Sequence, residues 1–365
     1  MNILFLTYQG DIAGSTNSIS YLAKGLSEKG HNIYVGCRKE SLLYKMLENT
    51  SVNLIAMKFK SKLDFDNIKH IKEVVSSNNI DIINAQSSKD RYNSIFAKIF
   101  YRFPAKVVHT RRQTPKSSGV LVQNWFYNTF TDMIVAVSDE IKKELIKIGI
   151  KEKKVEVIYN GTPDYKYKVV DQSWKEILKK KYGFEEQDIV LGCVSRKKEQ
   201  DQLIEAMARL PKNYKLILIG ISQNEFENSY MKQIRDNNLE NRIISLGMIS
   251  GEETLNHYQI FDVNILCSTM EGLSQSLLEA MYLGVPVIAT RAAGNIDLIK
   301  NGENGLFFEN GDVETLAKLI KTIIEDSNLK QKLIENGEKT ARVDFSIDKV
   351  VENYEKKFGE LINSK

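Results

Sequence analysis

Residues 263–290, VNILCSTMEGLSQSLLEAMYLGVPVIAT, contain the unit on which the fold is built: a strand, a loop, a helix and a second strand. Val263–Leu266 and residues 285–289 are short apolar runs, as in strands that are covered on both faces. The residues between them have a helical period. Glu271 falls in the loop after the first strand, and Glu279 falls about one turn into the helix. Because ligands bind at the loops that follow parallel strands, the two acids indicate a binding site.

The same alternation of apolar runs and amphipathic stretches extends along the whole chain. The expected strands are 2–7, 32–37, 81–84, 106–109, 133–137 and 155–158 in the first half, and 189–194, 215–219, 242–246, 263–266, 285–289 and 305–308 in the second. Strands separated by helices predict parallel sheets, so the fold class is α/β with two Rossmann-like domains, residues 1–165 and 166–345. A C-terminal helix is expected in 346–365, and the polar segment 162–174 is the expected linker.

The composition excludes several classes of protein. The chain has 365 residues, of which 42% are hydrophobic, so it can bury a large core. No apolar run reaches the length of about 18 residues that a membrane-spanning helix needs, and the opening MNILFLTYQG is expected to be a buried strand rather than a signal peptide. Cys37, Cys193 and Cys267 have no spacing typical of zinc ligands or of a disulfide framework. The expected compartment is the reducing cytoplasm.

Positive charge is concentrated in the first half of the chain. Residues 1–165 contain 24 Lys and Arg against 16 Asp and Glu, whereas residues 166–365 contain 27 against 31. The densest basic stretch, residues 89–116, contains a single acid, Asp90. This asymmetry predicts an anionic partner for the first domain, either a lipid surface or a phosphorylated acceptor, and nucleic acid is not expected.

The two glutamates and the helix start between them suit a nucleotide sugar. A carboxylate at position 271 can accept hydrogen bonds from the hydroxyls of a sugar. Helical side chains lean toward the helix N-terminus, so Glu279 can reach back toward the same place. The unpaired backbone N–H groups at the helix start offer a seat for a diphosphate. A lone glutamate on a helix is otherwise a solvated surface residue, and this alternative stays open for Glu279.

The chain resembles family 4 of the retaining glycosyltransferases. The resemblance is carried by VIYNGTP (157–163), LGCVSRKKEQDQLIEAMARL (191–210), IISLGMIS (243–250) and the run 268–312. It implies the GT-B fold, in which two Rossmann-like domains face each other across a cleft. The first domain would then offer the acceptor surface, and the second would hold a nucleoside diphosphate sugar. It also implies that no metal and no cofactor is needed, and that the C-terminal helix crosses back to the first domain.

The resemblance assigns roles to individual residues. Glu271 would bind the hydroxyls of the donor sugar, and Glu279 would bind the ribose. Arg196 and Lys198 would neutralise the diphosphate, whose charge grows as the sugar leaves; taken alone, their charged run would be a solvated loop. The backbone positions that would approach the donor are Gly272, Leu273, Ser274 and, in the glycine loop GDIAGSTNS of the first domain, Gly14.

Some positions depart from the family pattern. Arg112 stands where many members have a histidine near the reacting carbon, and Glu199 stands where the family usually has a glycine. Arg111 and Arg112 are the candidates on the acceptor side. A non-catalytic GT-B scaffold that binds a nucleotide sugar or a partner protein is therefore the alternative function. A nicotinamide-dependent oxidoreductase is less favoured, because GDIAGSTNS lacks the Gly-x-Gly-x-x-Gly pattern and Arg38 stands where a ribose-binding acid is expected.

The predicted function is retaining transfer of a sugar from a UDP-sugar, with a GDP-sugar second, to a cell-surface glycan or glycolipid. Asp64 and Asp66 resemble a metal-binding Asp-x-Asp, but capping of a helix is the favoured interpretation. Residues 93–106, NSIFAKIFYRFPAK, interleave aromatic and basic residues. They predict either contact with an anionic membrane or a helix face that packs on a sheet. Contact with an anionic membrane would place the protein peripherally on the inner face of the cytoplasmic membrane.

Overall fold

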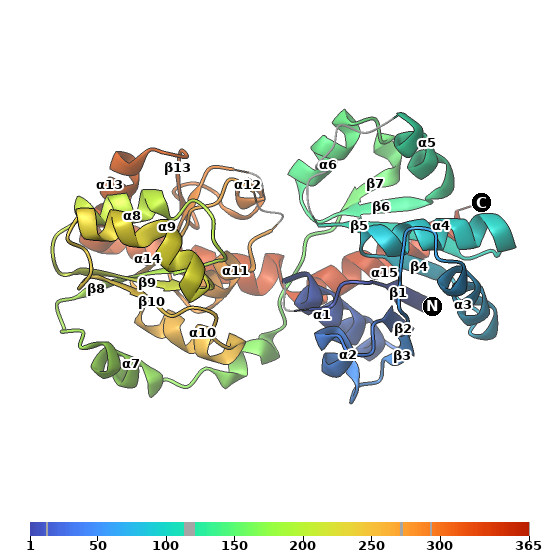
Figure 1. Ribbon diagram of the computed structural model, residues 1–365, viewed down its shortest axis with the longest axis horizontal. Coiled ribbons are helices and arrows are strands. Elements are labelled where there is room, and N and C mark those ends of the chain that lie inside the picture. Colours follow the sequence, from blue (N-terminus) through green and yellow to red (C-terminus); the bar gives the residue numbers. More distant parts are fainter. Residues whose placement is uncertain (12–13, 113–120, 271–272, 293, 365) are drawn as a thin grey trace. The chain divides into compact units, whose positions relative to one another are not determined.

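The computed structural model describes residues 1–364 except 12–13, 113–120, 271–272 and 293. The chain divides into two compact units, one formed by Met1–Pro163 with Ser346–Lys365 and the other by Asp164–Phe345. Each unit contains a parallel sheet with helices between its strands (Figure 1). The predicted α/β class with two Rossmann-like units is confirmed. Among the described helices, none combines the length and the apolar character needed to cross a bilayer.

The first unit is built on a seven-stranded sheet with the order β3-β2-β1-β4-β5-β6-β7. Its strands are β1 (Asn2–Leu6), β2 (Asn32–Cys37), β3 (Asn53–Ala56), β4 (Ile82–Ala85), β5 (Lys106–Arg111), β6 (Met133–Ala136) and β7 (Val155–Val157). Its helices are α1 (Gly14–Glu28), α2 (Leu42–Leu47), α3 (Phe65–Ser77), α4 (Ser88–Tyr101), α5 (Leu121–Phe130), α6 (Asp139–Lys147), the short η1 (Glu152–Lys154) and α15 (Ile347–Asn363). The central strands β1 and β4 are almost wholly buried, which explains their continuous apolar sequences.

Strand β3 is the strand that the sequence analysis missed. Its four residues, NLIA, lie at the edge of the sheet and pair with β2 alone. None of them is fully buried, so the apolar pattern is short and incomplete. The twelve predicted strands agree with observed ones to within two residues at each end. The short, incomplete apolar pattern is therefore why β3 was missed.

The second unit is built on a six-stranded sheet with the order β10-β9-β8-β11-β12-β13. Its strands are β8 (Ile189–Val194), β9 (Tyr214–Ile219), β10 (Ile243–Ser245), β11 (Val263–Leu266), β12 (Val287–Thr290) and β13 (Leu306–Phe308). Its helices are η2 (Asp164–Val169), α7 (Trp174–Tyr182), α8 (Asp201–Ala208), α9 (Gln223–Asp236), α10 (Gly251–His257), η3 (Tyr258–Ile260), α11 (Gln275–Tyr282), α12 (Asn295–Leu298), α13 (Val313–Glu325), α14 (Ser327–Lys339) and η4 (Thr340–Asp344). The adjacent strands β8 and β11 matter most, because the candidate donor residues follow them.

Helix α15 packs on the first unit, against α1 (Figure 1). Ser346 caps its N-terminus by accepting a hydrogen bond from the backbone N–H of Lys349. Its buried apolar side chains belong to the same core cluster as β1, β2 and α1. Gly25 of α1 permits this packing, because a Cβ atom there would lie 2.6 Å from a methyl carbon of Val351. The C-terminal helix is thus an integral part of the first unit.

The predicted linker has more structure than its polar composition indicated. Residues Asp164–Val169 form the helix η2 at the start of the second unit. Tyr167 stacks on Tyr282 of α11 with ring centroids 3.5 Å apart, and the hydroxyl of Tyr282 donates to Asp164 at 2.9 Å. These contacts hold η2 against α11, which brings Lys166 into the candidate site.

Candidate functional site

Helix α11 begins at the carboxyl edge of the second sheet, directly after the loop that follows β11. Ser274 is its N-cap and accepts a hydrogen bond from the backbone N–H of Leu277 at 3.4 Å. Leu273 and Ser274 are both buried. Glu271 and Gly272, two of the predicted donor-binding residues, lie outside the described residues. The helix start therefore lies where a diphosphate seat was predicted.

Glu279 lies on α11 and is held by two partners. Its carboxylate forms an ion pair with the ammonium of Lys166 from η2, and its other oxygen accepts a hydrogen bond from the Tyr258 hydroxyl at 3.2 Å. The side chains of Lys166 and Glu279 are only 12% and 14% exposed. The alternative that Glu279 is a solvated surface residue is therefore wrong.

Tyr258 remains a hydrogen-bond donor because its environment opposes ionisation. The side chain is fully buried. Burial, and then the neighbouring carboxylate of Glu279, hold the pKa of the Tyr258 hydroxyl well above its ordinary value. The same hydroxyl also lies 3.1 Å from the backbone oxygen of Ser276. Tyr258 and Lys166 thus fix the position of the carboxylate from two sides.

The loop after β8 carries Arg196 and Lys198 and is folded around a buried glutamine. The Gln200 side chain donates to Ser195 Oγ at 2.7 Å and to the Arg196 carbonyl at 2.8 Å, and it accepts from the Tyr230 hydroxyl at 2.8 Å. Arg196 is exposed and Lys198 is half-buried. The loop is consequently ordered by internal hydrogen bonds while the Arg196 side chain remains exposed.

The loop after β8 is tied to the loop after β11. The Glu199 carboxylate accepts hydrogen bonds from the backbone N–H of Thr269 at 3.3 Å and from its hydroxyl at 2.8 Å. The ammonium of Lys198 donates to the carbonyl of Met270 at 3.0 Å. Glu199, which replaces a glycine of the family pattern, therefore joins the cationic loop to the residues that precede Glu271.

The three candidate residues of the first unit, Gly14, Arg111 and Arg112, have different surroundings. Gly14 is the first residue of α1 and follows β1, next to residues 12–13, which the structure does not describe. Arg112 donates to the side-chain oxygen of Gln86. Arg111, the last residue of β5, instead lines a cavity of about 110 Å³. The two predicted acceptor-side arginines thus have different surroundings.

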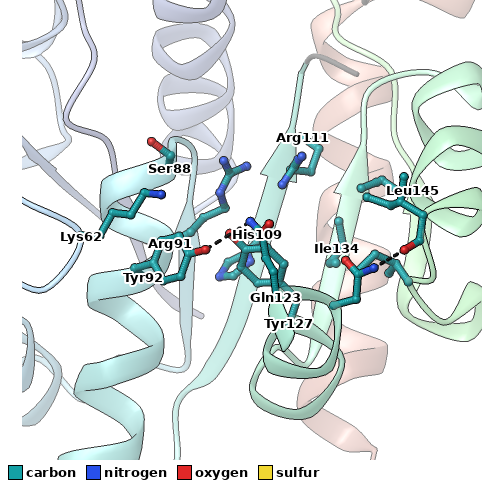
Figure 2. Close-up of a pocket in the computed structure, with 13 residues that line it drawn as sticks. Lys62, Ser88, Arg91, Tyr92, His109, Arg111, Gln123, Tyr127, Ile134 and Leu145 are labelled. Carbon is teal, nitrogen blue, oxygen red and sulfur yellow. Dashed lines mark hydrogen bonds between the residues drawn. The ribbon is translucent and has the colours of Figure 1, made fainter. Parts of the chain in front are cut away.

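Arg91 of α4 and His109 of β5 line the same cavity as Arg111, and the sequence analysis missed both (Figure 2). His109 is 1% exposed, and burial followed by the charges of Arg91 and Arg111 holds its pKa well below the ordinary value. Its ring is therefore neutral near pH 7. A signal was present in the sequence, because residues two apart on a strand share a face, and His109 and Arg111 are such a pair.

The Asp-x-Asp pattern belongs to a helix start. Asp64 is the N-cap of α3, accepts from the backbone N–H of Asn67 at 3.4 Å and from that of Lys60 at 2.8 Å, and is buried. Asp66 pairs with Lys60 at 3.1 Å. The capping interpretation is confirmed. Within the described part of the chain, no three His, Cys, Asp or Glu side chains are grouped as metal ligands would be.

The aromatic and basic residues of 93–106 divide between the core and the surface. Phe96 packs against the core of the first unit, and Phe103 is buried in it. Phe100 is 51% exposed and stacks on Phe65 of α3, which is 65% exposed, with ring centroids 6.3 Å apart. Lys98 forms an ion pair with Asp132 at 3.0 Å. The packing interpretation therefore holds for Phe96 and Phe103, whereas Phe100 and Tyr101 of this segment stay on the surface.

Comparisons with known proteins agree with this architecture. Residues 175–340 match the family described as "Glycosyl transferases group 1", and residues 12–164 match "Glycosyltransferase Family 4". The chain is 26% identical over 348 residues to "Putative glycosyltransferase EpsD" of Bacillus subtilis (strain 168), covering 90% of this chain and 89% of that protein. It is 30% identical over 233 residues to "Lipopolysaccharide core biosynthesis glycosyltransferase LpsE" of Rhizobium meliloti (strain 1021), covering 63% of this chain and 64% of that protein.

A solved structure shares the fold over almost the whole chain. Anabaena Alr3699/HepE in complex with UDP and glucose superposes with a TM-score of 0.84 at 23% identity, covering 98% of this chain and 99% of that one. At this level of identity the similarity establishes the two-domain α/β architecture of the GT-B fold.

Proposed function

Because the chain belongs to the family 4 glycosyltransferases (glycosyl transferases group 1) and is a glycosyltransferase with the GT-B fold, we propose that it uses a nucleoside diphosphate sugar as donor. A UDP-sugar is the first choice and a GDP-sugar the second. The acceptor would be a glycan or glycolipid of the cell surface. The names of LpsE and of the UDP complex of HepE support this proposal for the acceptor class and the donor base.

The observation that carries the proposal is the buried ion pair of Glu279 beside a helix start. An ionised carboxylate can accept about four hydrogen bonds, and Lys166 and Tyr258 account for two. The remaining capacity matches the two hydroxyls of a ribose. In this account Glu279 binds the ribose of the donor, and Glu271 binds the hydroxyls of its sugar.

The diphosphate would bind between the helix start and the cationic loop. The backbone N–H groups near Leu273 and Ser274 carry the positive end of the α11 dipole. Arg196 and Lys198 come from the neighbouring strand β8, and the Glu199–Thr269 contacts tie their loop to that of β11. These groups supply the charge that a metal ion supplies in other transferases, so the proposed reaction needs no metal and no further cofactor.

The proposed reaction retains the configuration of the sugar. The bond between the anomeric carbon and the diphosphate oxygen breaks, and the acceptor oxygen bonds to that carbon on the same face. The departing phosphate oxygen takes the proton of the acceptor hydroxyl, so no protein nucleophile is required. Positioning of the two substrates and stabilisation of the leaving diphosphate would supply the rate enhancement.

We also propose that the protein works in the cytoplasm and contacts the inner face of the membrane through the surface formed by Leu63, Phe65, Phe100 and Tyr101. These four side chains are 43–65% exposed, Phe65 and Phe100 stack on each other, and Leu63 and Tyr101 are close to them in sequence. The exposed cations Lys62 and Arg102 adjoin them in sequence. Aromatic rings and cations together suit the edge of an anionic bilayer.

The experiment that tests the proposed function is donor hydrolysis and transfer by the purified protein. UDP-sugars and GDP-sugars are incubated with and without a glycan acceptor, and release of the nucleotide is measured together with the anomeric configuration of the product by NMR. Release of UDP or GDP with retained configuration is the expected result. An inverted product, or no turnover of any nucleotide sugar under conditions in which the nucleotide binds, would contradict the proposal.

A further inference from the structure

The cavity beside Arg111 has the size of an anionic group. Its volume of about 110 Å³ is far above the 10–15 Å³ or so that a single water needs. It lies in the first unit between α4, β5, α5 and α6, and Arg111 marks the carboxyl end of β5. Ligands of parallel sheets bind at that edge. The exposed Lys62 also lines the cavity, which gives it a side that reaches solvent.

Positive charge in this cavity has no matching negative charge among the described residues. Neither Arg91 nor Arg111 lies within ion-pairing distance of a carboxylate there, and the sequence of 113–120 contains no acid. The nearby Asp90 is engaged elsewhere, because its carboxylate accepts from the backbone N–H groups of Tyr8, Gln86 and Ser87.

Polar atoms in the cavity also lack partners. The Nε of Arg91 and the Nε2 of His109 are buried and form no hydrogen bond with the described residues. Burial, and then the charge of Arg91, lower the pKa of the Arg111 guanidinium to about 10. A buried guanidinium nitrogen and a buried ring nitrogen without partners, beside a second like charge, are costly unless a ligand joins them.

Lys62 and Ser88 also line the cavity, and most of its remaining walls are apolar or already hydrogen-bonded. Ile134, Leu145, Ile148 and Ile150 form one side, which lowers the local dielectric and strengthens a charged contact. Gln123 donates to the Tyr92 hydroxyl, and Asn124 donates to the carbonyl of Ile148. Figure 2 shows Arg91 and Arg111 extending from α4 and β5 toward the same space near His109. The two arginines are thus charged groups available to a ligand, with His109 beside them.

We propose that Arg91, Arg111 and His109 form a binding site for an anionic group, a phosphate or a carboxylate, carried by the acceptor. A guanidinium binds either group with two parallel hydrogen bonds, and the neutral His109 ring adds a further polar contact. The inference deepens the proposed function and rests on it, since it names the chemical class of the acceptor: a phosphorylated or acidic glycan or glycolipid.

The test measures binding of inorganic phosphate and of malonate by calorimetry at constant ionic strength, with saturating UDP present to occupy the cationic loop of the second unit. Wild type is compared with Arg91→Gln and Arg111→Gln. Lys143→Gln is the matched control, because Lys143 lies on α6, is exposed and does not line the cavity. The inference predicts saturable binding of at least one anion by wild type and the control, and at least tenfold weaker binding by the two cavity variants.

Equal binding by all four proteins, or no saturable binding by wild type, would overturn the inference. Binding of UDP in the same samples separates this failure from failure of the proposed function, which would remove UDP binding itself. The unfolding temperature of each variant is measured in parallel. Since each substitution removes one of two neighbouring like charges, we expect no loss of stability, so weaker anion binding reports on the site.

Discussion

The substitution Lys166→Met should weaken nucleotide binding although Lys166 need not touch the nucleotide. The change removes the ammonium and keeps an unbranched apolar stem. Glu279 then retains only the Tyr258 hydroxyl as a hydrogen-bond partner among the described residues. Its side chain is only 14% exposed, so the charge is left without the cation that compensates its burial.

The expected magnitudes follow from this burial. Removing one partner of a buried ion pair costs about 3–5 kcal/mol, and the residual exposure of both side chains places the loss of stability at the lower end, about 3 kcal/mol. UDP affinity should fall about tenfold, which corresponds to ~1.4 kcal/mol, because the carboxylate is no longer held for the ribose. Tyr258→Phe is the matched control: it removes a neutral donor worth about 1 kcal/mol and keeps the ion pair, so its effect on affinity should be smaller.

Urea unfolding and calorimetric titration with UDP measure the two effects. The double variant Lys166→Met/Glu279→Gln replaces the unpaired charge with a neutral amide, so it should recover most of the stability and little of the affinity. UDP binding by Lys166→Met that is as tight as, or tighter than, wild type would refute the reasoning, because it would show that Lys166 competes with the ribose for Glu279.

Three further predictions concern other parts of the account. Glu271→Ala should leave UDP affinity near the wild-type value and lower turnover about a hundredfold, because it removes one group that stabilises the transition state. Equal losses of UDP affinity in Glu271→Ala and Glu279→Ala would contradict the division of roles between the two glutamates. EDTA should leave activity unchanged, whereas loss of activity that manganese restores would show that a metal takes part. Sedimentation with vesicles of anionic lipid should be lost in Phe65→Ser/Phe100→Ser and kept in Trp125→Ser, a control with a comparably exposed aromatic residue on α5. Retention of binding by the double variant would show that this surface is not the membrane contact, and failure of wild type to sediment would contradict membrane contact altogether.

The elements that the sequence predicted are those whose burial leaves a periodic signal. The strands of both sheets are apolar because helices cover their two faces. Strand β3 escaped because its apolar pattern is only two residues long, with Asn53 and Ala56 exposed on either side. Helix η2 escaped because its stabilising contacts are polar or aromatic side chains that meet α11, as Tyr167 and Tyr282 do.

Only part of the candidate site could be predicted, because the sequence shows where an element lies and not what it packs against. The position of Glu279 after a strand and one turn into a helix could be inferred from its motif. Its partner Lys166 could not, because the two residues are 113 positions apart and only the packing of η2 brings them together. Arg91 and His109 illustrate the same limit, since a helix and a strand supply them separately to one cavity. Sequence periodicity locates elements, whereas pairs of side chains depend on how those elements pack.

The most direct test of the central claim is the thermal unfolding of wild type and of Glu279→Ala with UDP, GDP and NAD⁺. A ligand that binds only the native state stabilises it by about 2.7 kcal/mol when its concentration is a hundred times Kd. The account predicts that UDP, or secondly GDP, raises the unfolding temperature of wild type, that NAD⁺ does not, and that Glu279→Ala loses most of the shift. A full nucleotide shift in Glu279→Ala, or a shift with NAD⁺ alone, would contradict it.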